Sequence, residues 1–252
     1  MSIRGSVALV TGASSGIGRA TAEALATAGA HVLVHGRDKN ALDELAERIG
    51  GTVLVADLSW PGEAERLADA ALAVAGRVDI LVANAGIGHA GTFVEMPPNE
   101  VDPLVAVNLT APMRLVRALM PGMIERRRGY VCFVSSIAAR TGVAKEAVYA
   151  ATKAGLDAFA DSLRMELNGT RVRVGVLIPG AVATNFFDRR GKAYGRTRPR
   201  PLRPEVLAST LVHMIDNGTA EAYLPRWLRV PVALRSLAPR TYRRLALRFG
   251  GS

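Results

Sequence analysis

Short apolar runs alternate with longer amphipathic segments along most of the chain, and this alternation restricts the fold more than any other feature. The apolar runs are rich in Val, Ile and Leu, which is typical of strands buried on both faces. We expect strands at residues 7–10, 31–35, 52–55, 78–83, 130–134, 172–177 and 220–224, and helices at 19–28, 41–49, 63–75, 100–124, 147–167 and 204–216. The pattern predicts an α/β fold, with a single Rossmann-type doubly wound parallel sheet and helices on both faces.

Cysteine and histidine usage limits the kinds of site that the chain can build. Cys132 is the single cysteine, which excludes a disulfide framework and a thiolate zinc cluster and favours a reducing compartment. The four histidines show no metal-ligand spacing, so we expect no metal. The N-terminus lacks the apolar run of a signal peptide, and polar residues interrupt the longest apolar stretch, 103–124. We therefore expect a cytoplasmic protein that does not span a membrane.

A glycine-rich turn lies between the first predicted strand and the first predicted helix. It reads Thr11-Gly12-Ala13-Ser14-Ser15-Gly16-Ile17-Gly18. Glycine allows backbone amides to approach phosphate oxygens, and the N-terminus of a helix attracts an anion. A tight turn alone also selects glycine, but the strand before it and the helix after it favour a site for the pyrophosphate of a dinucleotide.

The spacing Gly-x-x-x-Gly-x-Gly resembles that of the short-chain dehydrogenase/reductase family, and the resemblance runs from Val7 to about Thr184. The motifs that carry it are Thr11-Gly12-x-x-x-Gly16-Ile17-Gly18, Asp57-Leu58, Asn84-Ala85-Gly86, Asn108, Ser136, Tyr149-x-x-x-Lys153 and Pro179-Gly180-x-Val182-x-Thr184. So many motifs in one order are more specific than any single motif. The resemblance implies an oxidoreductase that uses a nicotinamide dinucleotide to interconvert a carbonyl compound and an alcohol.

The resemblance also implies which residues bind the cofactor. These are Thr11, Gly12, Ser14, Ser15, Gly16, Ile17, Gly18, Arg37, Asp57, Leu58, Asn84, Ala85, Gly86, Tyr149, Lys153, Pro179, Gly180, Val182 and Thr184. Asp57 and Leu58 would face the adenine, while the Val182 backbone and the Thr184 hydroxyl would hold the carboxamide. Ala83 stands where the family often has asparagine, a departure that we expect the site to tolerate.

The end of the second predicted strand reads His35-Gly36-Arg37-Asp38 and bears on the choice between NAD and NADP. An acid at this place binds the ribose 2′-hydroxyl of NAD, whereas a base binds the 2′-phosphate of NADP. Gly36 occupies the position of the acid, and Arg37 is suited to phosphate. The alternative is that Arg37 is only solvated and Asp38 caps the next helix. We expect NADP(H) to be preferred, with NAD(H) as the second choice.

Tyr149 and Lys153 are four residues apart on a predicted helix, so their side chains share a face. An ammonium beside a phenol favours the phenolate, which would lower the Tyr149 pKa from about 10 and allow proton exchange near neutral pH. Alternation along the fifth strand lets only one of Ser135 and Ser136 face the site, and the family spacing selects Ser136.

The resemblance implies a role for each catalytic residue. Tyr149 would be the general acid in reduction and the general base in oxidation. Ser136 would bond the carbonyl oxygen, Lys153 would hold the nicotinamide ribose, and Asn108 would support a water relay to Lys153. We expect a catalytic Rossmann-fold domain at residues 1–225, which the family's behaviour suggests would assemble as a homodimer or homotetramer.

Two segments carry most of the net charge of +10. We expect residues 185–218 to form the substrate loop and lid. They begin Asn185-Phe186-Phe187 and become basic over 189–203. This composition suggests an apolar carbonyl substrate with an anionic far end, and the alternative is a solvated loop. Residues 226–252 hold seven arginines and no acid, and apolar residues recur there at helical spacing. This amphipathic segment suits an anionic membrane surface, or packing on the body or a subunit interface.

Several classes of function remain open at this point. The first is an NADP-dependent oxidoreductase acting on a small carbonyl or alcohol, with an apolar or lipid-like substrate favoured. The second is a nucleotide-sensing protein that keeps the fold without turnover, and a third is a membrane-surface protein that binds through its tail, on the cytoplasmic face. Nucleic-acid binding is not expected, because aromatic residues are only 5% of the chain and no recognised motif accompanies the charge.

Overall fold

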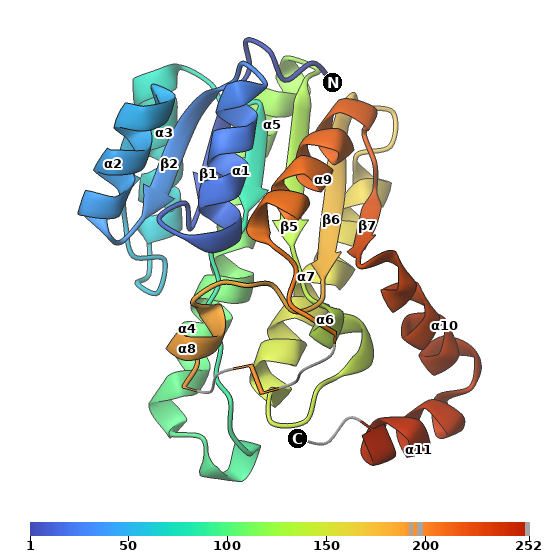
Figure 1. Ribbon diagram of the computed structural model, residues 1–252. Coiled ribbons are helices and arrows are strands. Elements are labelled where there is room, and N and C mark those ends of the chain that lie inside the picture. Colours follow the sequence, from blue (N-terminus) through green and yellow to red (C-terminus); the bar gives the residue numbers. More distant parts are fainter. Residues whose placement is uncertain (192–193, 196–198, 250–252) are drawn as a thin grey trace.

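A parallel seven-stranded sheet forms the centre of the protein (Figure 1). The computed structural model describes residues 1–191, 194–195 and 199–249, apart from the side chain of the last of these. The strands are β1 (Val7–Thr11), β2 (His31–Gly36), β3 (Thr52–Val55), β4 (Ile80–Ala83), β5 (Gly129–Val134), β6 (Val172–Pro179) and β7 (Glu221–Leu224). Their order in the sheet is β3-β2-β1-β4-β5-β6-β7, and every neighbouring pair is parallel.

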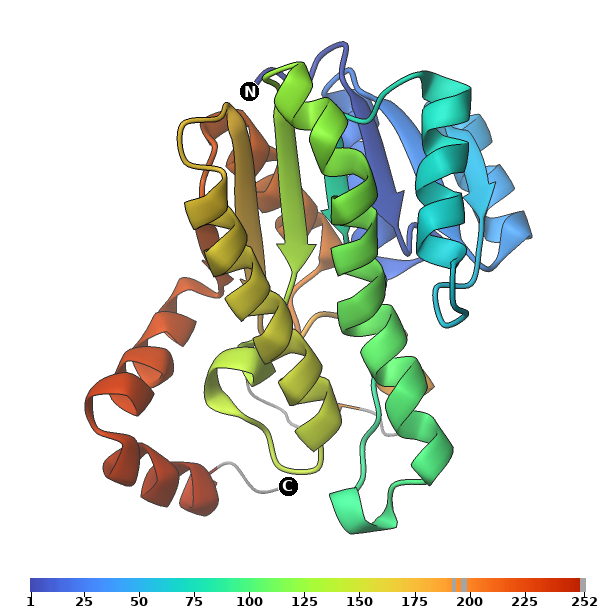
Figure 2. The same cartoon turned by 180° about the vertical axis from the view of Figure 1, so that it is seen from behind.

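Helices cover both faces of the sheet, as Figures 1 and 2 show from opposite sides. One face carries α1 (Gly16–Thr27), α2 (Lys39–Ile49) and α9 (Pro204–Asn217), and the other carries α3 (Glu63–Ala75), α5 (Ala111–Glu125) and α7 (Ala147–Glu166). Successive residues of β1 enter opposite cores: Leu9 packs with one cluster, and Ala8 and Val10 with the other. The predicted doubly wound α/β fold is confirmed.

The order of the strands places a crevice between β1 and β4. β1 pairs with both β2 and β4, so the chain reverses its direction of travel across the sheet at this point. Ligands bind at such a switch point, outside the carboxyl ends of the strands. The glycine-rich turn follows β1 and Asn84 follows β4, so both lie at this edge.

The structure corrects several predicted helix boundaries. The helix expected at 100–124 is divided into α4 (Val101–Val105), a π-helical turn (Ala106–Thr110) and α5, because the extra residue of the wider turn lets Asn108 point into the protein. Two short helices, α6 (Ile137–Thr141) and α8 (Phe186–Arg189), were not predicted, since segments of this length show no helical periodicity. Short 3-10 turns lie at Phe93–Glu95, Pro98–Glu100 and Arg226–Leu228.

The C-terminal segment leaves the sheet after β7 and forms α10 (Arg229–Leu237) and α11 (Pro239–Phe249). Pro239 separates them, as expected for a residue that cannot continue a helix. Figure 1 shows the two helices beside and below the carboxyl edge of the sheet, and α10 contacts α6. Among the described helices, none combines the length and the apolar character that a bilayer crossing requires.

Candidate active site

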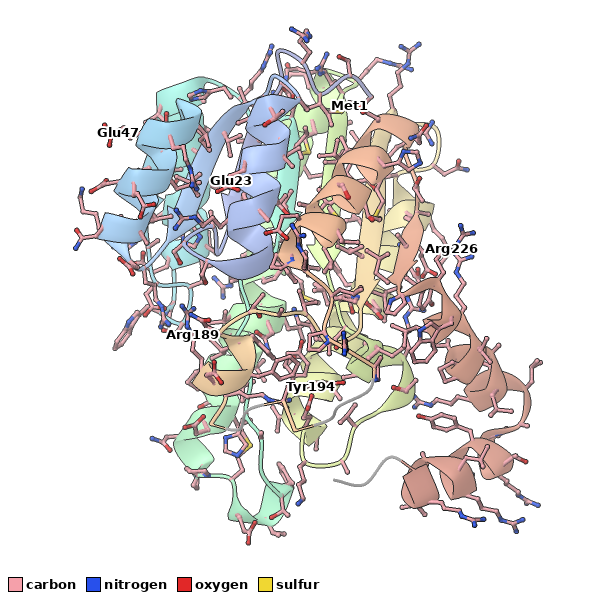
Figure 3. All side chains as sticks on the ribbon, viewed as in Figure 1. Met1, Glu23, Glu47, Arg189, Tyr194 and Arg226 are labelled. Carbon is pink, nitrogen blue, oxygen red and sulfur yellow. The ribbon has the colours of Figure 1, made fainter. Side chains whose placement is uncertain are left out.

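A cavity of about 1410 Å³ runs along the carboxyl edge of the sheet. Pockets for a single small ligand usually have about 300–1,000 Å³, so this one has room for a cofactor and a substrate together. Its lining begins at the glycine-rich turn, passes Ser136, Tyr149 and Lys153, and ends at the tail. Figure 3 shows Arg189 and Tyr194, which also line it, below the sheet on the segment that follows β6.

The glycine-rich turn is packed too closely for side chains. A Cβ on Gly18 would lie 2.1 Å from the Gly12 carbonyl oxygen, and one on Gly16, whose φ is +56°, would lie 2.8 Å from Thr184 Cγ2. Within the described chain, the Ser15 side chain makes no capping hydrogen bond to α1 and the first turn of α1 has no acid. Backbone N–H groups at this terminus are therefore free to bind an anion, so the turn fits the pyrophosphate of a dinucleotide.

Thr11 and Asn84 hold the ends of β1 and β4 together beneath the turn. The Thr11 hydroxyl accepts hydrogen bonds from the backbone N–H groups of Asn84 and Ala85, both at 3.0 Å. The Asn84 side-chain amide donates to the carbonyls of Thr11 (2.9 Å) and Gly12 (3.2 Å). Asn84 and Gly86 line the cavity. Thr11 supports it from below by fixing the backbone at Asn84 and Ala85.

Arg37 lies at the mouth of the cavity. Its side chain is 65% exposed, and its Nη1 lies 3.5 Å from Asp57 Oδ2. Asp38 accepts a hydrogen bond from the Ala41 backbone N–H at 3.1 Å and caps α2, which bears out that part of the alternative interpretation. Leu58 is buried beside Asp57 at the same wall.

Two titratable groups near Arg37 have shifted pKa values. Burial lowers the pKa of His35 to about 4, although a hydrogen bond with the Ala56 carbonyl and the Asp57 charge oppose the shift. Burial tends to raise the pKa of Asp57, but hydrogen bonds from Ser59 and the charge of Arg37 outweigh it and leave that pKa below its ordinary value. At neutral pH the wall beside Arg37 therefore holds a neutral imidazole and a carboxylate.

Lys153 and Asn108 meet below Gly86. Lys153 is 4% exposed, and its Nζ donates to the Val134 carbonyl at 2.8 Å. The Asn108 amide binds the backbone of Ile87 in both directions at 2.9 Å. A Cβ built on Gly86 would lie 3.3 Å from Asn108 Oδ1 and 3.5 Å from Lys153 Nζ, so both polar groups face the same small space.

Ser136 and Tyr149 face one another across this part of the cavity. Ser136 caps α6 by accepting a hydrogen bond from the Ala138 N–H at 3.1 Å, and its hydroxyl also interacts with the Tyr149 phenol. The neighbouring Ser135 also reaches the cavity wall, but it is buried and interacts with Asp157 rather than with Tyr149. The family spacing therefore selected the serine that faces Tyr149.

The structure contradicts the expected low pKa of Tyr149. Burial raises the pKa of Tyr149 to about 12, against an opposing hydrogen bond with Ser136. The Nζ of Lys153 lies 5.9 Å from the centre of the phenol ring, and burial lowers the pKa of Lys153 itself to about 8. The cost of removing the phenolate from water outweighs the opposing effects of the Ser136 hydrogen bond and the Arg190 charge.

The segment after β6 completes the far end of the expected cofactor site. Pro179, Gly180, Val182 and Thr184 all line the cavity. Val182 is buried and forms an isolated bridge with Leu202. The turn that they form is packed against the glycine-rich turn through the Thr184 methyl group.

The substrate loop was expected from the sequence, but its contacts and the part played by the tail were not. The Phe186 ring lies 5.5 Å from the Tyr149 ring, and Arg190 forms an ion pair with Glu146 and stacks 4.6 Å from the Phe187 ring. The tail contributes Trp227, Leu228, Pro231, Tyr242, Arg243, Leu245, Ala246 and Leu247. Their convergence depends on tertiary packing, so no local signal could have found them. The basic residues Lys192, Arg196 and Arg198 lie outside the described residues.

Comparison with known proteins agrees with this geometry. The family model for short chain dehydrogenases matches residues 6–195. The chain belongs to the short-chain dehydrogenase/reductase family. Like other members of this family of oxidoreductases, it is an enzyme built to use a nicotinamide dinucleotide.

Individual relatives of this short-chain dehydrogenase/reductase cover most of its length. An uncharacterized short-chain type dehydrogenase/reductase of Sinorhizobium fredii is 42% identical over 183 residues, which are 72% of this chain and 71% of the relative. A short-chain dehydrogenase from Sphingobium yanoikuyae, solved with NADPH, superposes with a TM-score of 0.82 at 28% identity, covering 98% and 96% of the two chains. A 3-ketoacyl-(acyl-carrier-protein) reductase from Brucella melitensis, solved with NADH, has a TM-score of 0.81 at 31% identity, covering 89% and 99%.

Within the described residues, no three His, Cys, Asp or Glu side chains gather closely enough to hold a metal ion. Cys132 is fully buried in β5, and burial raises the pKa of its thiol to about 12. The cavity at the carboxyl edge therefore remains the candidate active site.

Proposed function

We propose that the protein is an NADP(H)-dependent oxidoreductase that interconverts the carbonyl group of an apolar, lipid-like ketone or aldehyde with the corresponding alcohol. The observation that carries this proposal is one continuous cavity with an anion-binding turn at one end and apolar side chains at the other. Ser136, Tyr149 and Lys153 lie between the two ends. A cofactor and a substrate would therefore meet beside these three side chains.

Each of the three side chains has a task that its surroundings support. When bound, the nicotinamide supplies or accepts a hydride at the substrate carbon. Tyr149 donates its proton to the developing alkoxide in reduction, and a pKa of about 12 keeps that proton on the phenol at neutral pH. Ser136 is within reach of the same oxygen because it interacts with the Tyr149 hydroxyl. Lys153 binds the ribose hydroxyls, and Asn108 supports it from the small space beside Gly86 that both side chains face.

The preference for NADP(H) rests on Arg37. Gly36 leaves the usual place of an acid empty of any side chain, and Arg37 is 65% exposed at the cavity mouth. Its contact with Asp57 at 3.5 Å is long for an ion pair at the surface and is weak in water. A 2′-phosphate would offer the guanidinium a doubly charged partner with better geometry.

The apolar substrate is supported by the wall opposite the cofactor. Phe186 and Phe187 line it from α8, and Leu228 and Leu245 from the tail. The cationic Arg243 lies at the same wall, where an anionic group at the far end of a substrate would meet it. A long apolar molecule with a reactive carbonyl near Tyr149 fits this distribution.

The direct test is a screen of NADPH oxidation over ketosteroids, retinoids, acyl thioesters, quinones and sugars. We expect turnover with an apolar member, and we expect Tyr149→Phe to lower kcat by at least about 100-fold while NADPH still binds. Tyr130→Phe is the matched control, because it removes a buried phenol hydroxyl that donates to Thr219 and lies away from the cavity. NADPH binding without turnover of any carbonyl in the wild-type protein would instead favour a nucleotide sensor.

A second candidate function, binding to an anionic membrane on the cytoplasmic face, is supported by α11. Tyr242, Leu245, Ala246 and Leu247 all line the cavity, yet only Tyr242 and Ala246 are half-buried, and Leu245 and Leu247 are 41% and 85% exposed. Exposed arginines lie on the same helix. A cationic, partly apolar helix at the mouth of a substrate cavity would place that mouth next to a bilayer.

Vesicle co-sedimentation at two salt concentrations tests this candidate. Removing residues 239–252 should abolish binding to vesicles rich in anionic lipid. This truncation keeps the buried residue Leu228, which precedes the removed segment. The point variant with Arg240, Arg243 and Arg244 changed to Gln should lose about 1 kcal/mol of binding per cation at low salt. The matched control changes three exposed arginines elsewhere, Arg4, Arg117 and Arg171. Equal losses in the two triple variants, or no vesicle binding by the full chain, would eliminate the membrane candidate.

A further inference from the structure

A second cluster of charges, whose Asp157 is buried and whose Arg140 and Glu221 are partly buried, lies next to the catalytic side chains. Asp157 follows Lys153 by one turn of α7 and is 5% exposed. Its Oδ2 accepts a hydrogen bond from Arg140 Nε at 2.6 Å, and Arg140 Nη2 donates to Glu221 Oε1 at 2.7 Å. A buried ion pair contributes little net stability, because removing both charges from water offsets their attraction. The pair therefore calls for another explanation.

We propose that Arg140 and Asp157 are positioning residues for the reaction. The ion pair ties the helix that starts at Ser136 to the helix that carries Tyr149 and Lys153, and the Asp157 carboxylate stabilises the charge of the buried Lys153 ammonium. This inference rests on the proposed oxidoreductase function.

The first role follows from the weakness of α6. A helix of five residues has too few internal hydrogen bonds to hold its place by itself. Ser136 caps its first turn, and Arg140 lies four residues further on. The Arg140 guanidinium is held by α7 and β7 through Asp157 and Glu221. The position of the Ser136 hydroxyl relative to Tyr149 therefore depends on this side chain.

The tail secures the other end of the same helix. Arg235 of α10 donates to the Arg140 carbonyl, and the Tyr242 hydroxyl of α11 donates to the Thr141 carbonyl at 3.0 Å. Carbonyls at the end of a helix lack partners within the helix, so these two side chains supply them. The ion pair fixes the side of α6, and the tail fixes its C-terminal end.

The second role follows from the charges around Lys153. The groups that face it or its neighbours are Tyr149 and Asp157 on α7, Arg140 on α6, and Glu221 and Tyr223 on β7. Burial lowers the pKa of Lys153 to about 8, and Asp157 is the opposing charge. With Asp157 ionised, the positive charges of Lys153 and Arg140 are balanced by the negative charges of Asp157 and Glu221. Without it, Lys153 would share the interior with Arg140 and lose its proton more easily.

The sign of the effect on pH dependence is fixed by the ammonium. Activity that needs charged Lys153 is lost as pH rises through its pKa, which lies at about 8. Removal of the Asp157 charge lowers that pKa, so activity should be lost at a lower pH. We expect Asp157→Asn to move the alkaline limb of kcat/KM down by at least about half a pH unit and to lower kcat about 10-fold at pH 7.5.

The matched control lies one turn further along the same helix. Asp161 pairs with Arg164 but is 47% exposed, so Asp161→Asn removes an equivalent charge from the surface. It should leave both kcat and the alkaline limb unchanged. Asp157→Glu keeps the charge and should restore the limb, while Arg140→Lys keeps a cation but loses the forked contact to both carboxylates and should lower kcat with little change in KM.

The outcomes separate the positioning role from a structural one. An Asp157→Asn enzyme that matches Asp161→Asn in kcat and alkaline limb overturns the proposal. If Asp157→Asn does not fold, Asp157→Glu and Arg140→Lys decide it: a kcat equal to wild type in Arg140→Lys overturns the tie to α6. If the wild-type protein reduces no carbonyl, the proposed function fails. The pH dependence of NADPH binding then reports the protonation state of Lys153 directly. An identical pH dependence in wild type and Asp157→Asn again overturns the role of Asp157.

Discussion

The two walls of the cavity are built in different ways. The cofactor wall consists of strand ends and turns whose residues are interlocked; Ala8, Leu9 and Val10 of β1 are completely buried. The substrate wall includes α10 and α11, in which none of the described residues is buried. Close packing makes the first wall intolerant of change, because a Cβ added at Gly12 or Gly18 would meet backbone atoms and one at Gly16 would meet the Thr184 side chain. The second wall is attached by a few side-chain contacts and can vary with the substrate.

The largest expected effect lies in the cofactor wall. Gly18→Ala would place a Cβ 2.1 Å from a backbone oxygen, so it should lower the free energy of unfolding by about 3 kcal/mol or more and abolish NADPH binding. Gly195→Ala makes the same chemical change on the substrate side, where a Cβ would meet none of the described residues within 4 Å, and should have little effect. Chemical denaturation and NADPH fluorescence measure both. Similar losses of stability and of NADPH binding in the two variants would contradict the difference between the two walls.

Arg37→Ala should give the next largest effect. Loss of a charged contact to the 2′-phosphate should cost about 1.5–3 kcal/mol of NADPH binding and leave NADH binding nearly unchanged. Lys39→Ala is the control, since Lys39 is a neighbouring cation, 67% exposed and paired with Asp43. Titration of both cofactors measures the effect. Equal weakening of NADPH and NADH would mean that Arg37 supports the fold through Asp57.

A smaller effect is expected from the cap of α2. Asp38→Ala removes the hydrogen bond to the Ala41 N–H and should lower the free energy of unfolding by about 1 kcal/mol. Asp38→Asn keeps an accepting oxygen and should recover most of the loss. Thermal and chemical denaturation measure both variants. If Asp38→Ala leaves the free energy of unfolding unchanged, this edge of the cofactor wall is less rigid than its packing indicates.

The smallest effect is expected in the tail. Tyr242→Phe removes one half-exposed hydrogen bond to α6 and should lower the free energy of unfolding by only about 0.5 kcal/mol. The same denaturation series gives the value. A loss larger than that of Asp38→Ala would show that the tail is as firmly built into the molecule as the cofactor wall.

Much of the cofactor wall could be predicted from the sequence, because its signals are local. A glycine-rich turn between a strand and a helix can be read from a short stretch of sequence, and so can a Tyr-x-x-x-Lys pair on a helix. Neither is specific alone, and the order of all the family's motifs made both predictions specific. Alternation along β5 and the family spacing distinguished Ser136 from Ser135. Strand positions were also predictable, because continuous apolar runs have few other folded environments.

Local patterns could not place the residues that meet only in three dimensions. The contact of Arg140 with Asp157 and Glu221 joins three elements far apart in the chain. The approach of the tail to the cavity depends on the path taken after β7. The π-helical turn around Asn108 has no periodicity of its own.

The sequence by itself determined the sheet, because each strand is encoded by neighbours within one apolar run, and the order and spacing of the family's motifs predicted the nucleotide turn, Ser136, Tyr149 and Lys153. Only the tertiary structure decided the electrostatics of those side chains. The sequence indicated that Lys153 would lower the pKa of Tyr149, yet burial raises it to about 12. Proximity along a helix sets which groups are neighbours, but the free energy of a charge depends on how much water the whole fold has removed from it.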